Sequence, residues 1–487
     1  MDDNNRPTQR KGMLDPDNWE VFEDVTQNML STAIDKFIAA TDGPVWREPP
    51  TDLLKKLNIP LPSEGRPLPE HETELKALLP YGVGNTHPRF FGWVHGAGSP
   101  GNLLAEIVAS AMNANCGGRN HIAIRIERQV ISWMRDLFGF PDTASGLVVS
   151  GTSMATIIAA KAARDQAIGT TSRTNGIGGA QLVGYVSAQA HSCLDRAFDM
   201  LGLGTNALRK IPVNDAFEID IDALQDQIRR DREAGLTPFF IGGTAGTVNT
   251  AAVDDLTALA QLAAAEKLWF HVDGAFGACI KLSEDYKHRL KGIEAADSLA
   301  FDFHKWLHVN YDAGCVLVRS ESAHRNAFAK RPDYLAAEGQ ALAGGEPWPV
   351  DYGPELSRGF RALKVWAHFL EHGTDKLGQS ITFNCELATY LGEKVDAHPQ
   401  LVRMAPVSLN ICCFRAIPEG VPETELDELT RTIVVRLQSD GTAAPSTTRI
   451  DGKLVIRVNI TNHRTQHEDI DILISAIGDL LAEIAPT

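Results

Sequence analysis

Two neighbouring stretches, LWFHVDGAFG (268–277) and SLAFDFHKWLHVNYDAGCVLVR (298–319), decide how this chain is interpreted. Each begins with a short apolar run typical of a buried strand, and the runs lead to Asp273 and Lys305. A lysine in mostly uncharged company is costly, because leaving water lowers its pKa unless the ammonium is paired or used chemically. A lysine with a lowered pKa suits a Schiff base, and a strand-end aspartate suits a pyridinium nitrogen.

Short apolar runs alternate with helical stretches through the middle of the chain. Continuous apolar strands separated by helices are typical of a largely parallel sheet with both faces covered. The fold class is therefore predicted as α/β, with a mainly parallel sheet and helices on both faces. We expect its strands at 147–150, 182–187, 239–243, 268–273, 298–302 and 315–319.

An N-terminal unit of helix and connector is predicted over residues 1–100. Apolar residues recur every three or four positions over 19–40, which predicts an amphipathic helix that either embraces a second subunit or docks on its own chain. Residues 41–88 are rich in proline and are expected to cross the surface without regular structure. The aromatic and glycine-rich stretch that follows is predicted to be a loop, with a helix starting at Ser99-Pro100.

Two further units are predicted, a large domain over 101–384 and a small C-terminal α/β domain over 385–487. The large domain is expected to contain a helix at 121–138 and to close with a helix at 360–372. Helices then alternate with strands, which we expect within SLNICCFRA (408–416) and KLVIRVNI (453–460).

The composition is that of an acidic globular protein. The 487 residues include 46 Lys and Arg against 62 Asp and Glu, a net charge of −16 that argues against nucleic acid or an anionic membrane as partner. The chain shows neither an apolar run of about 18 residues nor the apolar core of a signal peptide, so we expect a cytoplasmic protein. The 7 cysteines lack metal-ligand spacing and suit buried thiols in a reducing compartment, with no metal site.

Gly151, Thr152 and Ser153 follow the strand expected at 147–150 and precede an alanine-rich helix. Glycine and hydroxyl residues at a helix N-terminus offer N–H groups, a favourable dipole and O–H donors to a phosphate. A plain helix cap is the alternative, since serine and threonine are preferred at that position.

Other candidate residues fall at the ends of later strands. His191 follows the strand at 182–187, where open α/β sheets bind ligands, and it either stacks on a flat ring or serves a structural role. Thr244 lies in a glycine-rich strand end that permits close approach of a ligand or a tight turn. Ala275 leaves room for a planar ring beside Asp273, whose alternative role is a helix cap.

His304 and Lys305 complete the set, and the alternative for Lys305 is a side chain whose ammonium reaches solvent. The order of the candidates along the chain is more specific than any one of them. A phosphate loop, a stacking histidine, an aspartate and a lysine at the ends of consecutive strands describe a pyridoxal 5′-phosphate (PLP) site.

The chain resembles the group II PLP-dependent amino-acid decarboxylases, the family of aromatic L-amino-acid, tyrosine, histidine and glutamate decarboxylases. The resemblance runs from about Trp19 to the end and is tightest over 147–319. It rests on six segments: Gln189-Ala190-His191-Ser192, His271-Val272-Asp273-Gly274-Ala275, Ala296-Asp297-Ser298, His304-Lys305-Trp306-Leu307, Arg331-Pro332-Asp333-Tyr334-Leu335 and Leu356-Ser357-Arg358-Gly359-Phe360-Arg361.

This resemblance implies an aspartate-aminotransferase-like fold with a seven-stranded sheet, and a homodimer with active sites at the subunit interface. It assigns the Schiff base to Lys305, the pyridinium contact to Asp273 and ring stacking to His191. The phosphate falls to Thr152 and Ser153. Three departures remove no catalytic group: Gly274 stands where alanine is common, Phe303 where proline often occurs, and Ser357 where glycine is frequent.

The resemblance also implies roles for three further residues. His304 lies near the phosphate and the imine, and Ser357 touches the phosphate bound by the neighbouring subunit. Tyr334 lies on a loop that closes over the site, where it protonates the substrate carbon after CO₂ leaves. Aldehyde synthases of the family often carry phenylalanine at this loop position, so Tyr334 favours simple decarboxylation over the alternative of an aldehyde synthase.

The substrate is the least determined feature of the sequence. The aromatic residues Phe90 and Trp93, together with His95, favour an aromatic or bulky L-amino acid. An acidic amino acid would need a fixed cation, for which Arg119 and Arg125 are candidates, although helix arginines are commonly solvated. A catalytically silent partner protein is a further alternative, against which the intact set of His191, Asp273 and Lys305 argues.

Overall fold

A central sheet of seven strands organises the chain, whose computed structural model describes residues 13–330 and 339–484. Pairing is parallel from β4 through β3, β5, β6 and β7, whereas β8 runs antiparallel to β7 and β2. The predicted mainly parallel seven-stranded sheet is therefore confirmed. The strand order is β2 (Ser145–Val149), β8 (Gly314–Val318), β7 (Ser298–Asp302), β6 (Trp269–Asp273), β5 (Thr237–Thr244), β3 (Leu182–Ser187) and β4 (Leu208–Ile211).

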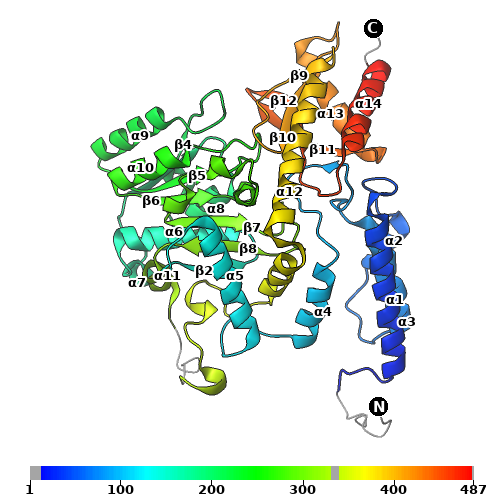
Figure 1. Ribbon diagram of the computed structural model, residues 1–487, viewed down its shortest axis with the longest axis horizontal. Helices are drawn as coiled ribbons and strands as arrows, with labels where there is room; N and C mark the ends of the chain where they lie inside the picture. The colour runs from blue at the N-terminus through cyan, green and yellow to red at the C-terminus, as the bar shows by residue number, and fades with distance from the viewer. Residues whose placement is uncertain (1–12, 331–338, 485–487) are drawn as a thin grey trace.

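Helices cover both faces of this sheet, because its strands are apolar on both sides. One face packs against α6 (Thr152–Ile168), α8 (Cys193–Met200) and α11 (Glu321–Phe328), with α7 (Ser172–Asn175) following α6. The other packs against α5 (Ile122–Phe138), α9 (Ile221–Glu233) and α10 (Leu256–Glu266), as Figure 1 shows. Leu147 belongs to the first core and Val148 to the second, as the alternation of side chains along a strand requires.

β4 was not predicted from the sequence. It lies at the edge of the sheet and reads Leu208-Arg209-Lys210-Ile211, with its two ends buried and Lys210 exposed. An edge strand tolerates polar side chains that water can solvate, so it lacks the continuous apolar run that marks the other strands.

A second sheet of five strands forms the C-terminal part of the chain and packs against α13 (Leu426–Ser439) and α14 (His467–Ile484). The predicted loop at 90–91 is wrong, because β1 pairs in parallel with β11 and sets Phe90 opposite Ala444. A segment far away in the sequence supplies the hydrogen-bond partners of these two residues. The strand order is β1 (Phe90–Phe91), β11 (Ala444–Ile450), β12 (Lys453–Asn459), β10 (Ile411–Ala416) and β9 (Leu401–Arg403).

The N-terminal segment forms helices that stand beside the rest of the chain in Figure 1. α1 (Trp19–Ile38) matches the predicted amphipathic helix and packs against α3 (Leu68–Leu78). The prediction that 41–88 lacks regular structure is wrong, since α2 (Thr51–Leu57) and α3 both lie there. Pro50 and Pro67 immediately precede these helices, a position where proline is compatible with helix formation rather than opposed to it.

The helix expected at 360–372 forms the first part of α12 (Arg361–Ala397), which consists of two helices joined by a kink at Gly373. Gly373 has φ 66° and ψ 167°, a backbone conformation that favours glycine. Val365 packs in the core of the seven-stranded part of the molecule and Leu391 in the core of the five-stranded part. The residue 384 boundary expected between domains therefore falls inside one element.

A buried ion pair connects distant segments of the domain that contains the seven-stranded sheet. Arg358 donates from Nη1 to Glu127 Oε2 at 2.9 Å and from Nη2 to Glu127 Oε1 at 2.6 Å. Glu127 Oε1 also accepts the N–H of Val148 on β2 at 3.0 Å. Burial opposes the positive charge of Arg358, but Glu127 outweighs it and raises the pKa of the guanidinium.

Among the helices within residues 13–330 and 339–484, none is long and apolar enough to cross a membrane.

Two buried histidines make the stability of the fold sensitive to acid. His271 bonds Ser298 Oγ at 2.8 Å, and His324 lies between Ser145 Oγ at 2.8 Å and Tyr352 O at 2.7 Å. Burial lowers the pKa of each imidazole to about 4. A histidine in the unfolded chain takes up its proton near pH 6.5, whereas the buried imidazole stays neutral at that pH. The unfolding free energy is therefore highest above pH 6.5 and decreases as the pH falls toward 4.

We therefore expect each of these histidines to lower the unfolding free energy by about 2 kcal/mol when the pH falls from 7.5 to 5. Urea unfolding of His324→Asn should show that much less loss over this interval than the parent protein. The matched control is His288→Asn, since the exposed His288 side chain stays in water and should leave the loss unchanged. Equal losses for parent and His324→Asn would contradict the assignment.

Candidate active site

The ends of four strands meet at one edge of the central sheet and form a cavity of about 500 Å³. The parallel register sets Thr244 on β5 opposite Asp273 on β6, and Asp273 opposite Ala300 on β7. A second hollow of about 390 Å³ adjoins the first at the N-terminus of α6. The two share five lining residues, namely His191, Ala275, His304, Lys305 and Tyr311. Predicted residues far apart in the sequence thus share one cavity.

Lys305 lies three residues beyond the last residue of β7 and is held by an ion pair. Its Nζ lies 3.0 Å from Asp302 Oδ2, and its side chain is 22% exposed. Burial lowers the pKa of Lys305, but the attraction of Asp302 and Asp273 is larger, so the net pKa lies above the ordinary value. The predicted lowering of this pKa is therefore wrong, because the sequence argument counted desolvation and missed Asp302.

Asp302 is the principal residue that the sequence analysis missed. It is 4% exposed, and its Oδ1 accepts the N–H of Thr152, the first residue of α6, at 2.6 Å. Its Oδ2 also lies 3.7 Å from His304 Nε2. The signal was present in the sequence SLAFDFHK, in which an aspartate ends an apolar strand three positions before the lysine.

Two donors orient the carboxylate of Asp273, which is 2% exposed. Its Oδ1 accepts the N–H of Ala275 at 3.1 Å, and its Oδ2 accepts the thiol of Cys193 at 3.5 Å. Burial, followed by the charge of Asp273, raises the pKa of the Cys193 thiol, so the thiol keeps the proton that it donates. Cys193 therefore contacts the site, a role that the interpretation of the cysteines as buried structural thiols did not foresee.

His191 lies between the two hollows, at the start of the turn that leads into α8. Its Nδ1 accepts the N–H of Cys193 at 3.2 Å, which fixes the orientation of the ring. Burial lowers the pKa of His191 and outweighs the opposite effect of Asp273. The imidazole is therefore neutral at physiological pH, which is compatible with stacking on a flat ring.

Unpartnered hydroxyl groups mark where a phosphorylated ligand fits. Thr152 Oγ1 at the N-terminus of α6 and Thr244 Oγ1 beside Asp273 are buried and have no hydrogen-bond partner among the described residues. Ser153 is exposed and lines the smaller hollow. A helix N-terminus with two hydroxyl residues, an aspartate and a lysine across one cavity matches the phosphate, ring nitrogen and aldehyde of PLP.

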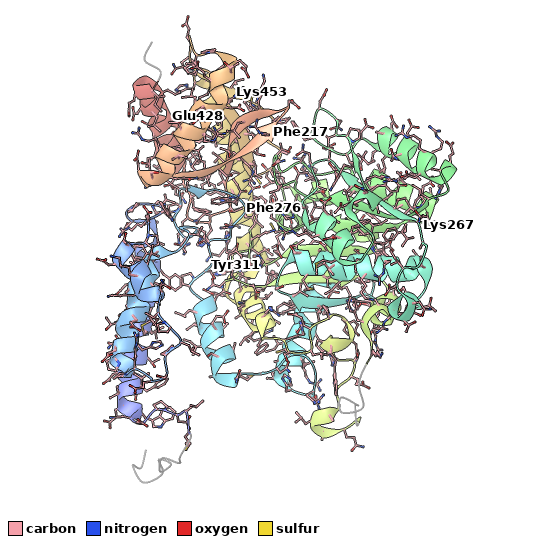
Figure 2. All side chains as sticks on the ribbon, turned by 180° about the vertical axis from the view of Figure 1, so that it is seen from behind. Phe217, Lys267, Phe276, Tyr311, Glu428 and Lys453 are labelled. Atoms are coloured by element: carbon pink, nitrogen blue, oxygen red, sulfur yellow. The ribbon has the colours of Figure 1, made fainter. Side chains whose placement is uncertain are left out.

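Aromatic side chains form the outer wall of the cavity. Figure 2 shows Phe276 and Tyr311 between the domain of the seven-stranded sheet and the remainder of the chain, and both line the cavity. Trp93 and His95 also line it and stack with ring centroids 5.8 Å apart. Phe90, predicted to contact substrate, is instead behind this wall, where it stacks on His95 at 5.6 Å and packs against Ala444. The pairing of β1 with β11 places it there.

Arg457 is a second residue that the sequence analysis missed. It is 3% exposed on β12, lines the cavity, and donates to Trp93 O at 2.9 Å and Val248 O at 2.7 Å. Its Nη2 has no partner among the described residues. Burial lowers the pKa of Arg457 to about 10, with no carboxylate of residues 13–330 and 339–484 in an ion pair with it, so the buried guanidinium remains charged. The sequence KLVIRVNI hid it, because an arginine within a strand usually faces solvent.

Three other predicted residues do not line the cavity, and a fourth falls outside the described residues. Ser357 is exposed and does not line either hollow of this chain. Arg119 stacks on Trp348, and Arg125 bonds Asn120, so neither supplies a cation to the cavity. Tyr334 lies outside the described residues, in the segment 331–338.

Comparison with known proteins agrees with this geometry. Residues 50–417 match the profile of the pyridoxal-dependent decarboxylase conserved domain. The chain belongs to this family. It is a PLP-dependent amino-acid decarboxylase, and the predicted cofactor and reaction class are confirmed.

Similar proteins extend along almost the whole chain. An aromatic-L-amino-acid decarboxylase of Bacillus atrophaeus is 35% identical over 435 residues, covering 86% of this chain and 88% of the relative. A phenylacetaldehyde synthase of Arabidopsis thaliana is 26% identical and covers 94% of this chain and 95% of the relative. The crystal structure of Oryza sativa TDC with PLP and tryptamine superposes with a TM-score of 0.88 at 24% identity, covering 97% and 100% of the two chains, which supports the fold.

Replacing Lys305 tests the centre of this site. Lys305→Ala should bind PLP without covalent attachment, so borohydride should no longer fix the cofactor to the protein, as mass spectrometry of the intact chain would show. Lys161→Ala is a matched control, because Lys161 is also partly buried and ion-paired, with Asp165 at 2.6 Å, but lies outside the cavity. Cofactor still fixed to Lys305→Ala would assign the attachment to another lysine.

Proposed function

We propose that this enzyme removes the α-carboxyl group of an aromatic or bulky L-amino acid, releasing the amine and CO₂. The observation that carries the proposal is the single cavity in which Lys305, Asp273 and His191 face an aromatic wall. Flat aromatic surfaces such as those of Trp93 and Tyr311 suit a planar side chain. The aromatic amino acids acted on by several named relatives support the same substrate class.

Each residue of the cavity has a distinct task in this proposal. When bound, PLP supplies the electron sink for the bond that breaks. Asp273 holds a proton on the ring nitrogen of the cofactor, and its two donors keep the carboxylate aimed there. His191 would cover one face of the ring, and the Lys305 amine would bind the cofactor aldehyde and give way to the substrate amine. Thr152, Ser153 and His304 hold the phosphate end, with Thr244 and Ala275 beside the ring.

Arg457 favours a second candidate substrate class, the acidic amino acids. A buried guanidinium without a carboxylate partner in the cavity wall is the fixed cation that a distal carboxylate needs. For an aromatic substrate the same group would orient the α-carboxylate. We favour the aromatic class because Trp93, His95 and Phe276 line the same cavity as Arg457.

Measuring CO₂ release with each standard amino acid separates the two classes. We expect turnover of tryptophan, tyrosine or phenylalanine and at least tenfold less turnover of glutamate and aspartate. The reverse order would replace the aromatic proposal by the acidic one. Amine, aldehyde and hydrogen peroxide should be measured together, since stoichiometric peroxide would identify an aldehyde synthase despite Tyr334.

Arg457→Gln should raise KM at least tenfold with a smaller change in kcat, because a charged hydrogen bond to the substrate carboxylate contributes roughly 1.5–3 kcal/mol. Arg449→Gln is the matched control, since Arg449 lies on neighbouring β11 but is exposed and paired with Asp427 at 3.0 Å. Unchanged KM in Arg457→Gln would exclude contact between Arg457 and the substrate.

We also propose a homodimer with active sites at the interface, in a reducing, cytoplasmic compartment. α1 has no buried residue in a single chain and exposes Trp19, Phe22, Leu30, Ile34 and Ile38. α4 (Asn102–Met112) exposes a further apolar stripe of Leu104, Ile107, Val108 and Met112. Apolar surface of this extent supports a subunit interface. The exposed position of Ser357 is compatible with a contact to a neighbouring active site, and free cysteines support a reducing compartment.

Charges placed on α1 test the interface. Ile34→Glu together with Ile38→Glu should weaken dimerisation at least tenfold in sedimentation equilibrium, because the charges would have to be buried in an apolar contact. Glu23→Gln, an exposed change on the same helix, should not alter the association. A monomer at all concentrations in the parent protein would contradict the homodimer.

A further inference from the structure

Asp302 occupies the position from which a phosphate would be held. Its Oδ1 accepts the N–H of Thr152, so the carboxylate caps the first turn of α6. The same helix end carries the unpartnered Thr152 hydroxyl. An anion held by a helix N-terminus is stabilised by the N–H groups and the dipole, whether the anion is a carboxylate or a phosphate.

Contacts on several sides hold the carboxylate at the N-terminus of α6. Its Oδ1 accepts the N–H of Thr152 at 2.6 Å, and its Oδ2 lies 3.0 Å from Lys305 Nζ. Asp302 is the last residue of β7 and is paired with Gly314 on β8, where an added Cβ atom would lie 2.6 Å from Asp302 Oδ1. Two strands and the start of α6 therefore position the carboxylate at the edge of the smaller hollow.

The surroundings of Asp302 hold one cation and one neutral proton donor. Lys305 Nζ balances the carboxylate at 3.0 Å. His304 Nδ1 accepts the N–H of Ala313 at 3.1 Å, so the neutral ring carries its hydrogen on Nε2, which lies 3.7 Å from Asp302 Oδ2. Burial keeps His304 neutral by lowering its pKa. The other charged side chains that line the two hollows are Asp273 and Arg457 in the larger one and Asp312 in the smaller one.

A phosphate dianion arriving at this helix end meets a fixed carboxylate of the same sign. Like charges in a partly buried site repel, and the hydrogen bond from Thr152 N–H and the ion pair with Lys305 keep the carboxylate in place. A proton shared by Asp302 and His304 would remove this repulsion. Protonated Asp302 would then donate to a phosphate oxygen, or protonated His304 would balance the carboxylate.

We propose that Asp302 acts as a positioning residue that makes binding of a phosphorylated cofactor depend on proton uptake, with one proton held between Asp302 and His304. In this structure the same carboxylate caps α6 and neutralises Lys305. The inference rests on the proposed placement of the phosphate at the N-terminus of α6.

Pyridoxamine 5′-phosphate is the probe that tests this coupling, because it lacks the aldehyde that condenses with Lys305. Its binding to the cofactor-free full-length protein at pH 8 is measured by calorimetry in two buffers that differ in ionisation enthalpy. We expect the parent protein to take up about one proton more than Asp302→Asn, whose amide is neutral and can donate to a phosphate oxygen. Between pH 7 and 9, the affinity of the parent should fall about tenfold more per pH unit than that of the variant.

The matched control is Asp297→Asn, at the other end of the same strand. Asp297 also accepts a backbone N–H, that of Phe270 at 2.8 Å, but it lies outside both hollows. This variant should show the proton uptake and pH dependence of the parent. The melting temperature of the cofactor-free Asp302→Asn protein should fall, since Lys305 loses its nearest counter-charge, whereas bound pyridoxamine 5′-phosphate should recover it.

Equal proton uptake and equal pH dependence in parent and Asp302→Asn would overturn the proposal. If Asp302→Asn fails to fold, Asp302→Ser tests the same difference with a neutral hydroxyl. The double variant Thr152→Val, Ser153→Ala distinguishes the role of Asp302 from the placement of the phosphate at the N-terminus of α6. Loss of affinity in that variant with no effect of Asp302→Asn would reject the role of Asp302 alone, whereas unchanged affinity would reject both this role and the placement of the phosphate.

Discussion

The site depends on a buried ammonium that must be balanced by carboxylates. Lys305 carries the charge, Asp302 neutralises it at 3.0 Å, and Asp273 adds a weaker attraction from the neighbouring strand. A lysine buried without such partners would lose its proton or destabilise the fold. The same arrangement keeps the amine close to the position where the cofactor aldehyde reacts. Charge balance in the empty protein and attachment of the cofactor therefore rely on the same few atoms.

The parallel sheet supplies the geometry that makes this balance possible. Parallel strands end at one edge, so Thr244 and Asp273 line the larger hollow and Asp302 lines the adjoining smaller one, although α10 and a long segment separate them in sequence. α6 starts at the same edge and directs its first N–H groups into the smaller hollow. The antiparallel β8 adds Gly314, whose missing side chain leaves space for Asp302. The positions of these strand ends therefore bring the residues of the site close to one another.

The cavity is completed by parts of the chain that lie outside the central sheet. β1 joins the five-stranded sheet and carries the chain onward to Trp93 and His95, while β12 of the same sheet supplies Arg457. α12 spans both parts and makes their relative position a consequence of two helices joined by a kink at Gly373. Substrate recognition is therefore expected to respond to changes in the C-terminal sheet, whereas cofactor attachment belongs to the central sheet.

The sequence by itself determined six of the seven strands of the central sheet, the family and the order of Thr152, His191, Asp273 and Lys305, because apolar periodicity and strand-end polarity are local properties. It did not reveal β1 or β4, whose residues become strands only through distant or edge pairing. The direction of the pKa shift of Lys305, the contact of Cys193 with Asp273 and the unpaired charge of Arg457 were decided by tertiary structure. Each depends on which charges and donors folding brings within a few ångströms, and electrostatic energies vary with that distance rather than with separation along the chain.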